Sequence, residues 1–163
     1  MIAMLRMGQT QFDAIRRHGE ETYPNECCGV LLGQMEEGGT MVIEAVSAHN
    51  TRSDSAHNRY DIAPQELIRI QQQARRRGLD IVGFYHSHPD HPAEWSKTDL
   101  EEAHWIGCSY VITRVAGSVT GGAGEAVRCR AMETNSFLLD GTGEEDKCLE
   151  RQPIQVVTEV GAR

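Results

Sequence analysis

Two histidines and an aspartate in one short stretch are the residues best suited to chemistry in this sequence. His86 and His88 stand at the end of an apolar run, residues 81–85, rich in β-branched and aromatic side chains. Such a run predicts a buried strand. Side chains two positions apart on a strand point to the same face, so the two imidazoles converge on one point. With Asp99 they form a three-ligand set, which suits one catalytic zinc ion whose fourth position stays open.

Each half of this pattern also has an interpretation that needs no metal. A His-x-His pair alone is typical of solvated strand ends and loops. Ser96 followed by Asp99 is a variant of the capping box, in which the serine begins a helix and the acid stands three residues later. The two interpretations are compatible, because a cap that fixes the helix start also fixes the direction of Asp99.

The order of these residues resembles a known signature. His86-Ser87-His88-Pro89, followed after six residues by Ser96 and then by Asp99, is similar to the JAMM signature of MPN-domain metalloproteases. That family places a glutamate well upstream, and residues 23–33, which include Glu26, resemble the corresponding segment. The similarity extends more loosely over most of residues 5–157.

The resemblance implies a role for each of five residues. It makes His86, His88 and Asp99 the ligands of zinc, which acidifies water and polarises a carbonyl group. Glu26 would move the proton from water to the leaving amine, and Ser96 would stabilise the oxyanion.

The resemblance also implies a substrate. JAMM enzymes cleave peptide or isopeptide bonds after the C-terminal Gly-Gly of ubiquitin or a ubiquitin-like protein. Glu26-Cys27-Cys28-Gly29 and His86-Ser87-His88-Pro89 are similar to the segments of a compact bacterial branch that releases cysteine. The expected partner is therefore a small ubiquitin-like sulfur-carrier protein, from which cysteine or a short C-terminal peptide is removed. The resemblance thereby implies a link to sulfur transfer and to cysteine or cofactor biosynthesis.

Three alternatives remain open at this stage. A non-catalytic MPN scaffold would bind partners only, although such domains usually lack the ligands that are present here. A RadC-like DNA-repair relative would carry a motif resembling His-Asn-His-Pro, whereas this chain has Ser87. A zinc deaminase would need a Pro-Cys-x-x-Cys segment, which the sequence lacks.

Composition narrows the class of protein. With 163 residues the length predicts a single domain over 1–163, with its core at about 5–157. Sixteen basic and 24 acidic residues give a net charge of −8, which argues against nucleic acid or an anionic membrane as partner. The sequence also lacks an apolar run long enough for a spanning helix. A homodimer is one candidate oligomeric state.

The five cysteines favour a reducing compartment. Their number is odd, Cys27 and Cys28 are adjacent, and no CxxC pair exists to hold a structural zinc. Since the short apolar start does not resemble a signal peptide, we expect a cytoplasmic protein. Cys108 and Cys129 lie in apolar runs and are expected to pack as small hydrophobic residues.

Alternating strand and helix patterns predict an α/β fold. The family resemblance implies a curved, mostly antiparallel mixed sheet flanked by helices, similar to that of cytidine deaminases. A helix with Thr10 as N-cap should end near Gly19, a second should begin at Pro64, and a third should run from Ser96 to about His104. The expected strands are residues 4–7, 29–34, 41–48, 60–62, 81–89, 108–115, 127–132, 137–139 and 154–157.

The remaining features have plain interpretations. The glycine-rich linker 117–124 has no phosphate-binding pattern. Arg75, Arg76 and Arg77 are expected to complement the negative end of a helix and to face solvent. His91 is expected at the surface or facing substrate. Trp95 is expected to pack at the helix start, with contact to a substrate groove as the alternative.

Overall fold

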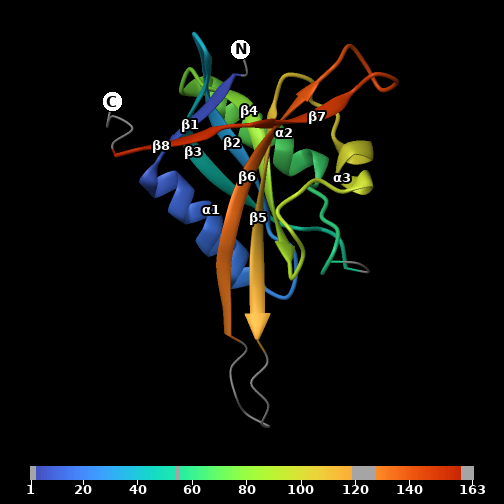
Figure 1. Cartoon of the computed structure of the whole chain (residues 1–163). Helices are drawn as coiled ribbons and strands as arrows, with labels where there is room; N and C mark the ends of the chain where they lie inside the picture. The colour runs from blue at the N-terminus through green and yellow to red at the C-terminus, as the bar shows by residue number, and fades with distance from the viewer. Residues whose placement is uncertain (1–2, 54–55, 119–127, 159–163) are drawn as a thin grey trace.

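The computed structural model describes residues 3–53, 56–118 and 128–158. Within these ranges the chain forms eight strands and three helices (Figure 1). In order they are β1 (Met4–Gly8), α1 (Gln9–Thr22), β2 (Cys28–Glu36), β3 (Gly39–Ala48), α2 (Pro64–Arg76), β4 (Asp80–Pro89), α3 (Lys97–Glu102), β5 (Ser109–Ser118), β6 (Arg128–Asp140), β7 (Cys148–Gln152) and β8 (Ile154–Val157).

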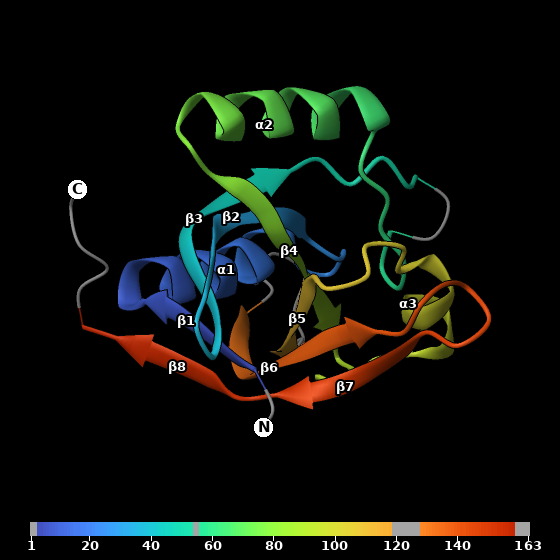
Figure 2. The same ribbon diagram turned by 90° about the horizontal axis from the view of Figure 1, so that it is seen from above.

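All eight strands join one curled sheet in the order β7-β6-β5-β4-β2-β3-β1-β8. The β2–β3, β2–β4, β5–β6 and β6–β7 pairs are antiparallel, whereas β1–β3, β1–β8 and β4–β5 are parallel. The two end strands, β7 and β8, are separated only by Pro153 and run end to end along one side of the molecule (Figure 2). The expected α/β fold with a curved, mostly antiparallel mixed sheet is confirmed.

The sheet is buried on both faces at its centre, where β2 and β4 lie. Helix α1 packs against strands β1, β3, β4, β5, β6 and β8 on one face, and α2 packs against β4 on the other. Leu31 and Tyr85 belong to the core on the α1 side, while Val30 and Phe84 belong to the core on the α2 side. Strands covered on both faces read as continuous apolar runs, which is why residues 81–85 carry no charged side chain.

Most of the expected elements are present, and four differ. Thr10 is not the N-cap of α1, because β1 leads directly into this helix and Gly8 takes that position. The same helix continues past Gly19 to Thr22. Residues 60–62 form no strand, since side-chain bonds to Asn50 hold them instead: Asn50 Oδ1 accepts from the N–H of Asp61 at 3.1 Å.

The other two differences concern the end of the chain. The strands expected at 127–132 and 137–139 are one strand, β6, because the polar residues between them find partners. Thr134 Oγ1 lies 2.9 Å from Thr113 Oγ1, and Ser136 Oγ donates to Gln152 Oε1 at 2.9 Å. The segment 140–150, where no strand was expected, contains the start of β7 at Cys148. Most of the glycine-rich linker 117–124 lies outside the described residues.

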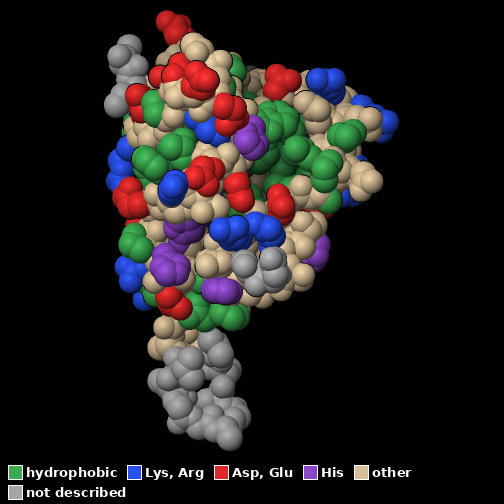
Figure 3. Space-filling view, turned by 90° about the vertical axis from the view of Figure 1, so that its right-hand side faces the viewer, with side chains coloured by type: hydrophobic (Ala, Val, Ile, Leu, Met, Phe, Trp, Pro, Cys, Tyr) green, Lys and Arg blue, Asp and Glu red, His purple; other side chains and the backbone are tan. Residues whose placement is uncertain are grey.

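The surface carries mixed charge. On the face in Figure 3, Lys and Arg side chains lie among Asp and Glu side chains, and hydrophobic side chains gather in one area. Arg75 and Arg76 lie in the last turn of α2, and Arg77 pairs with Glu44. All three are exposed, and as expected their positive charges lie at the negative end of the helix. No helix in the described parts of the chain is long and apolar enough to cross a membrane.

The cysteines are all free thiols. Cys27, Cys28 and Cys108 are buried, Cys129 is partly buried and Cys148 is exposed. The packing role expected for Cys108 is confirmed, whereas Cys129 lies nearer the surface and donates to the Glu20 carbonyl at 3.2 Å.

Candidate metal centre

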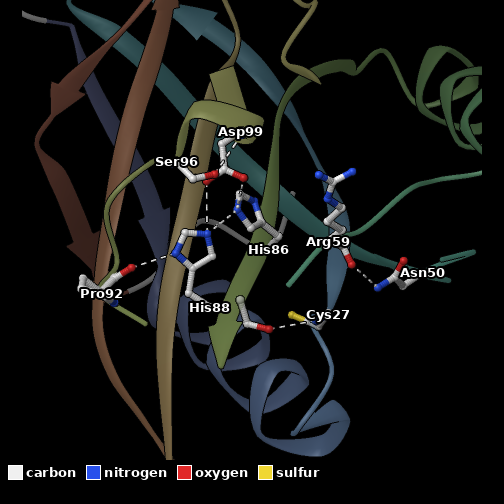
Figure 4. Close-up of polar contacts among 9 residues, drawn as sticks. Cys27, Asn50, Arg59, His86, His88, Pro92, Ser96 and Asp99 are labelled. Atoms are coloured by element: carbon white, nitrogen blue, oxygen red, sulfur yellow. Dashed lines mark hydrogen bonds and ion pairs between the residues drawn. The ribbon is translucent and has the colours of Figure 1, made fainter. Parts of the chain in front are cut away.

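Strand β4 ends at the two histidines. It lies between β2 and β5, with His86 opposite Cys28 and His88 opposite Arg114. Both imidazoles are buried, with 1% and 8% of their surface exposed, and their Nε2 atoms lie 3.1 Å apart (Figure 4). The strand therefore directs both rings to one face, as the spacing predicts.

The start of α3 aims a carboxylate at these rings. Ser96 is the N-cap: its Oγ accepts from the N–H of Asp99 at 3.0 Å, and its own N–H donates to Asp99 Oδ2 at 2.8 Å. Asp99 Oδ1 lies 3.2 Å from His86 Nε2, and Oδ2 lies 3.2 Å from His88 Nε2. The capping box and the carboxylate–histidine contacts thus occur together (Figure 4).

These three side chains fit a zinc ion. Tetrahedral zinc with bonds of about 2.0–2.1 Å separates neighbouring ligand atoms by about 3.3 Å. The distances of 3.1, 3.2 and 3.2 Å among the two Nε2 atoms and the carboxylate are close to that value. His88 Nδ1 lies 2.8 Å from the Pro92 carbonyl, which keeps the proton on Nδ1 and leaves the Nε2 lone pair directed at the site.

The surroundings of the site favour an ionised Asp99 carboxylate and act in opposite directions on the two imidazoles. Burial lowers the pKa of His86 despite the nearby charge of Asp99. Burial also acts to lower the pKa of His88, but the Asp99 carboxylate and the Pro92 carbonyl outweigh it and raise that pKa. Burial acts to raise the pKa of Asp99, and the two imidazoles outweigh it, so the pKa of this carboxyl lies well below its usual range.

Glu26 lies near the same two histidines. It is 4% exposed, and one carboxylate oxygen and one nitrogen of each ring lie within 4.8 Å of one another. Burial raises the pKa of Glu26 to about 8, with Asp99 adding to the shift and His88 opposing it. A buried carboxyl of this kind is largely protonated near neutral pH, and a nearby cation would lower its pKa and favour the ionised form.

Backbone contacts hold Glu26 in place. Its N–H donates to the Ala56 carbonyl at 2.6 Å, and its carbonyl accepts from Asn50 Nδ2 at 3.2 Å. The next residue, Cys27, donates its N–H to Ser87 Oγ at 2.8 Å (Figure 4). Ser87, the residue between the two histidines, therefore ties their strand directly to the glutamate segment.

Two cavities open at the site. One of about 410 Å³ reaches His88 and Ser96, and one of about 320 Å³ reaches Glu26 and Cys27. Trp95, 39% exposed, lines the first cavity beside the exposed His91. Trp95 therefore lines an open cavity, which agrees with the alternative of a groove contact rather than with packing at the helix start. His91 lies at the surface as expected.

One neighbour of the candidate site was not predicted from the sequence. The ring of Tyr60 stacks on the imidazole of His86, with 4.6 Å between the ring centroids and 26° between the planes. Tyr60 was expected in a strand, and no spacing relates it to the histidines. Its only distinguishing feature is that it is an aromatic residue in the polar segment 49–63.

Comparison with known proteins gives the following relationships. The family described as prokaryotic homologs of the JAB domain matches residues 9–131. A desampylase from Haloferax volcanii is 35% identical over 114 residues, which cover 66% of this chain and 78% of that protein. A probable TtuB-protein conjugate cleaving protease from Thermus thermophilus is 31% identical over 90 residues, covering 55% of this chain and 57% of that protein.

Two solved structures share the fold over nearly the whole chain. A protein from Salinibacter ruber is 33% identical, with a TM-score of 0.65 and coverage of 97% of this chain and 95% of its own. A protein from Desulfitobacterium hafniense is 24% identical, with a TM-score of 0.71 and coverage of 96% and 94%. The second likeness concerns the fold alone.

Proposed function

We propose a hydrolytic function for this chain, which belongs to the family of prokaryotic homologs of the JAB domain. The proposed reaction is zinc-dependent cleavage of a peptide or isopeptide bond after the C-terminal Gly-Gly of a small ubiquitin-like protein. The observation that carries the proposal is the convergence of His86, His88 and Asp99 at 3.1–3.2 Å, with the buried Glu26 beside them.

His86, His88 and Asp99 would hold one zinc ion. When bound, zinc supplies a Lewis acid that acidifies a water molecule and polarises a carbonyl group. The chain contributes an ionised Asp99 carboxylate and a His86 imidazole whose neutral form burial favours, while His88 would have to give up any proton on Nε2 to bind the metal.

Glu26 would move the proton. Burial raises the pKa of its carboxyl to about 8, and a bound zinc ion would favour the ionised form, which can take a proton from water and pass it to the leaving amine. The cavity of about 320 Å³ that reaches Glu26 offers space for the leaving group. Bonds from its backbone to Ala56 and Asn50 hold the segment that carries this carboxyl.

Ser96 would stabilise the oxyanion. Its Oγ accepts the Asp99 N–H, so its own O–H proton is free to donate to a substrate oxygen. Ser96 and Trp95 line the cavity of about 410 Å³, where the acyl part of the substrate would lie. A substrate tail threaded as an extended strand with a narrow approach to the metal would admit only small residues, which is a physical reason for Gly-Gly.

The names of the relatives support a protein conjugate as the substrate. The Thermus thermophilus relative is named for cleaving a TtuB-protein conjugate, and the Haloferax volcanii relative is named a desampylase. For this chain we propose a ubiquitin-like sulfur carrier, from which cysteine or a short C-terminal peptide is released. We further propose that residues 1–163 act as one domain in a reducing cytoplasm, where five free thiols persist.

Mass spectrometry of defined substrates tests the function. The zinc-loaded protein is incubated with a ubiquitin-like carrier extended past Gly-Gly by cysteine, and with the same carrier joined to a lysine side chain. We expect cleavage after Gly-Gly, its loss with a chelator, and its return when zinc is added. An Ala-Ala carrier is the control and should be cleaved far more slowly. Stoichiometric zinc without cleavage of either substrate would favour a scaffold instead.

A further inference from the structure

The two histidines of the site are held differently. His88 Nδ1 lies 2.8 Å from the Pro92 carbonyl, which fixes the orientation of its ring. The Nδ1 atom of His86 is buried and has no hydrogen-bond partner within the described parts of the chain. A histidine that binds metal usually donates its other ring N–H to an oxygen, which fixes the ring plane. His86 lacks that restraint, so its orientation depends on packing.

The packing partner of His86 is Tyr60. The two rings lie nearly parallel, with 4.6 Å between centroids and 26° between planes, whereas His86 and His88 are tilted by 55° at 4.9 Å. A flat ring against one face of the imidazole restricts rotation about the Cβ–Cγ bond. Rotation of that kind would move Nε2 away from Asp99 and His88.

Tyr60 is itself fixed from both sides. The carbonyl of Arg59 accepts from Asn50 Nδ2 at 3.0 Å, and the N–H of Asp61 donates to Asn50 Oδ1 at 3.1 Å. Figure 4 shows the contact between Asn50 and Arg59 close to the histidines. The same Asn50 amide group bonds the carbonyl of Glu26. The tyrosine therefore presents a rigid surface to His86.

We propose that Tyr60 is a positioning residue, whose ring holds the His86 imidazole in the orientation for metal binding in place of a hydrogen bond. The inference rests on the proposed zinc site. The stack is formed by the aromatic ring, so the hydroxyl group is dispensable for this role.

Zinc affinity of three variants tests the inference without any assay of activity. Tyr60→Leu removes the flat ring, Tyr60→Phe keeps it, and Phe137→Leu removes a buried aromatic ring from β6 as the matched control. Dissociation constants are measured by competition with a chromophoric chelator. We expect Tyr60→Leu to weaken zinc binding about 10–100-fold, the range for groups that orient a metal ligand. Tyr60→Phe and Phe137→Leu should bind as the wild type does.

The visible absorption of the cobalt-substituted protein gives a second readout. It reports ligand geometry, so Tyr60→Leu should change the spectrum and Tyr60→Phe should not. Should Tyr60→Leu fail to fold, as judged by circular dichroism, Tyr60→Met removes the ring with an unbranched side chain and takes its place. Wild-type affinity in a folded variant without the ring, or an equal loss in Tyr60→Phe, would overturn the inference. A wild-type protein that binds no zinc would overturn the proposed function as well.

Discussion

The site has two halves that are held together in different ways. The late half, residues 86–99, carries His86, His88, Ser96 and Asp99, and its side chains bond mainly to one another. The early half, residues 23–28, carries Glu26, which is held by backbone bonds to Ala56 and Asn50. The late half is thus built by local contacts, whereas the early half depends on segments distant in sequence.

This difference matches the proposed division of roles. Ligands must converge within a few tenths of an ångström, and a strand end facing a capped helix start provides that accuracy. A group that moves a proton needs a raised pKa, which burial by distant segments provides. The five predictions below test this comparison, from the largest expected effect to the smallest.

Removing a ligand from the late half should abolish binding and activity together. In His88→Ala, zinc content after dialysis should fall to near zero, because a ligand and its Pro92-fixed ring are both lost. Metal analysis and the cleavage assay measure the two effects. His91→Ala, at an exposed position nearby, should keep its zinc. Stoichiometric zinc in His88→Ala would show that the ligand set is wrong.

Replacing the Glu26 carboxylate of the early half by a neutral amide should leave zinc binding intact and lower turnover. Glu26→Gln should keep zinc and lose about 10²–10⁴-fold in kcat, the range for loss of a general base. Glu21→Gln, at an exposed position on α1, is the control. Persistent turnover would remove Glu26 from the proton-transfer role, and lost zinc would make Glu26 a ligand, since it approaches both rings within 4.8 Å.

Ser96 joins the cap of α3 to the proposed oxyanion donor. Ser96→Ala should lower kcat about 10²–10³-fold through the missing donor. It should also cost about 0.5–2 kcal/mol of folding free energy through the missing cap. Kinetics and chemical denaturation separate the two effects. Ser96→Thr keeps a hydroxyl for both and should retain most of each; unchanged kcat in Ser96→Ala would assign the residue to the cap alone.

Glu26 should make the metal-free protein less stable as pH rises. Its pKa is about 8 in the folded chain against an ordinary value of 4.5, so the folded state binds the extra proton between these values. Stability therefore falls across this window by a few kcal/mol and levels off above it. Denaturation of the chelated protein at pH 5 and pH 8 measures the loss, and Glu26→Gln should reduce it. An equal loss in that variant would assign the pH dependence to other groups.

The smallest effect should come from the contact of Tyr23 with Asp90, which ties the early half to the residue after β4. The Tyr23 hydroxyl donates to Asp90, which also accepts the N–H of Gly117 at 2.9 Å. A Cβ on Gly117 would lie 2.0 Å from the Tyr23 hydroxyl oxygen, so Gly117→Ala must displace this ring. We expect about 1–3 kcal/mol of destabilisation, measured by denaturation.

Gly143→Ala is the matched control for this contact, because its Cβ would meet no described atom within 4 Å. If Gly117→Ala is as stable as the control, the Tyr23–Asp90 contact does not hold the early half.

Features built from neighbouring residues were predicted from the sequence, whereas features that depend on distant segments were not. The strand at residues 81–89 and the cap at Ser96 were predicted because an apolar, β-branched run and a capping box are patterns of a few neighbouring residues. The strand expected at residues 60–62 was wrong, since bonds to Asn50, a residue ten positions earlier, override the local preference. The break expected within β6 was wrong because its polar side chains bond to other strands.

The sequence by itself determined the kinds of residue that could bind metal and the elements that carry them. Spacing along one strand and one helix start is a local property, and the family membership of the chain agrees with it. Only the tertiary structure decided that Glu26 is buried beside the histidines, that Ser87 ties the two halves together, and that Tyr60 covers His86. These contacts join segments more than twenty residues apart, and no local pattern encodes which distant side chain fills a given space.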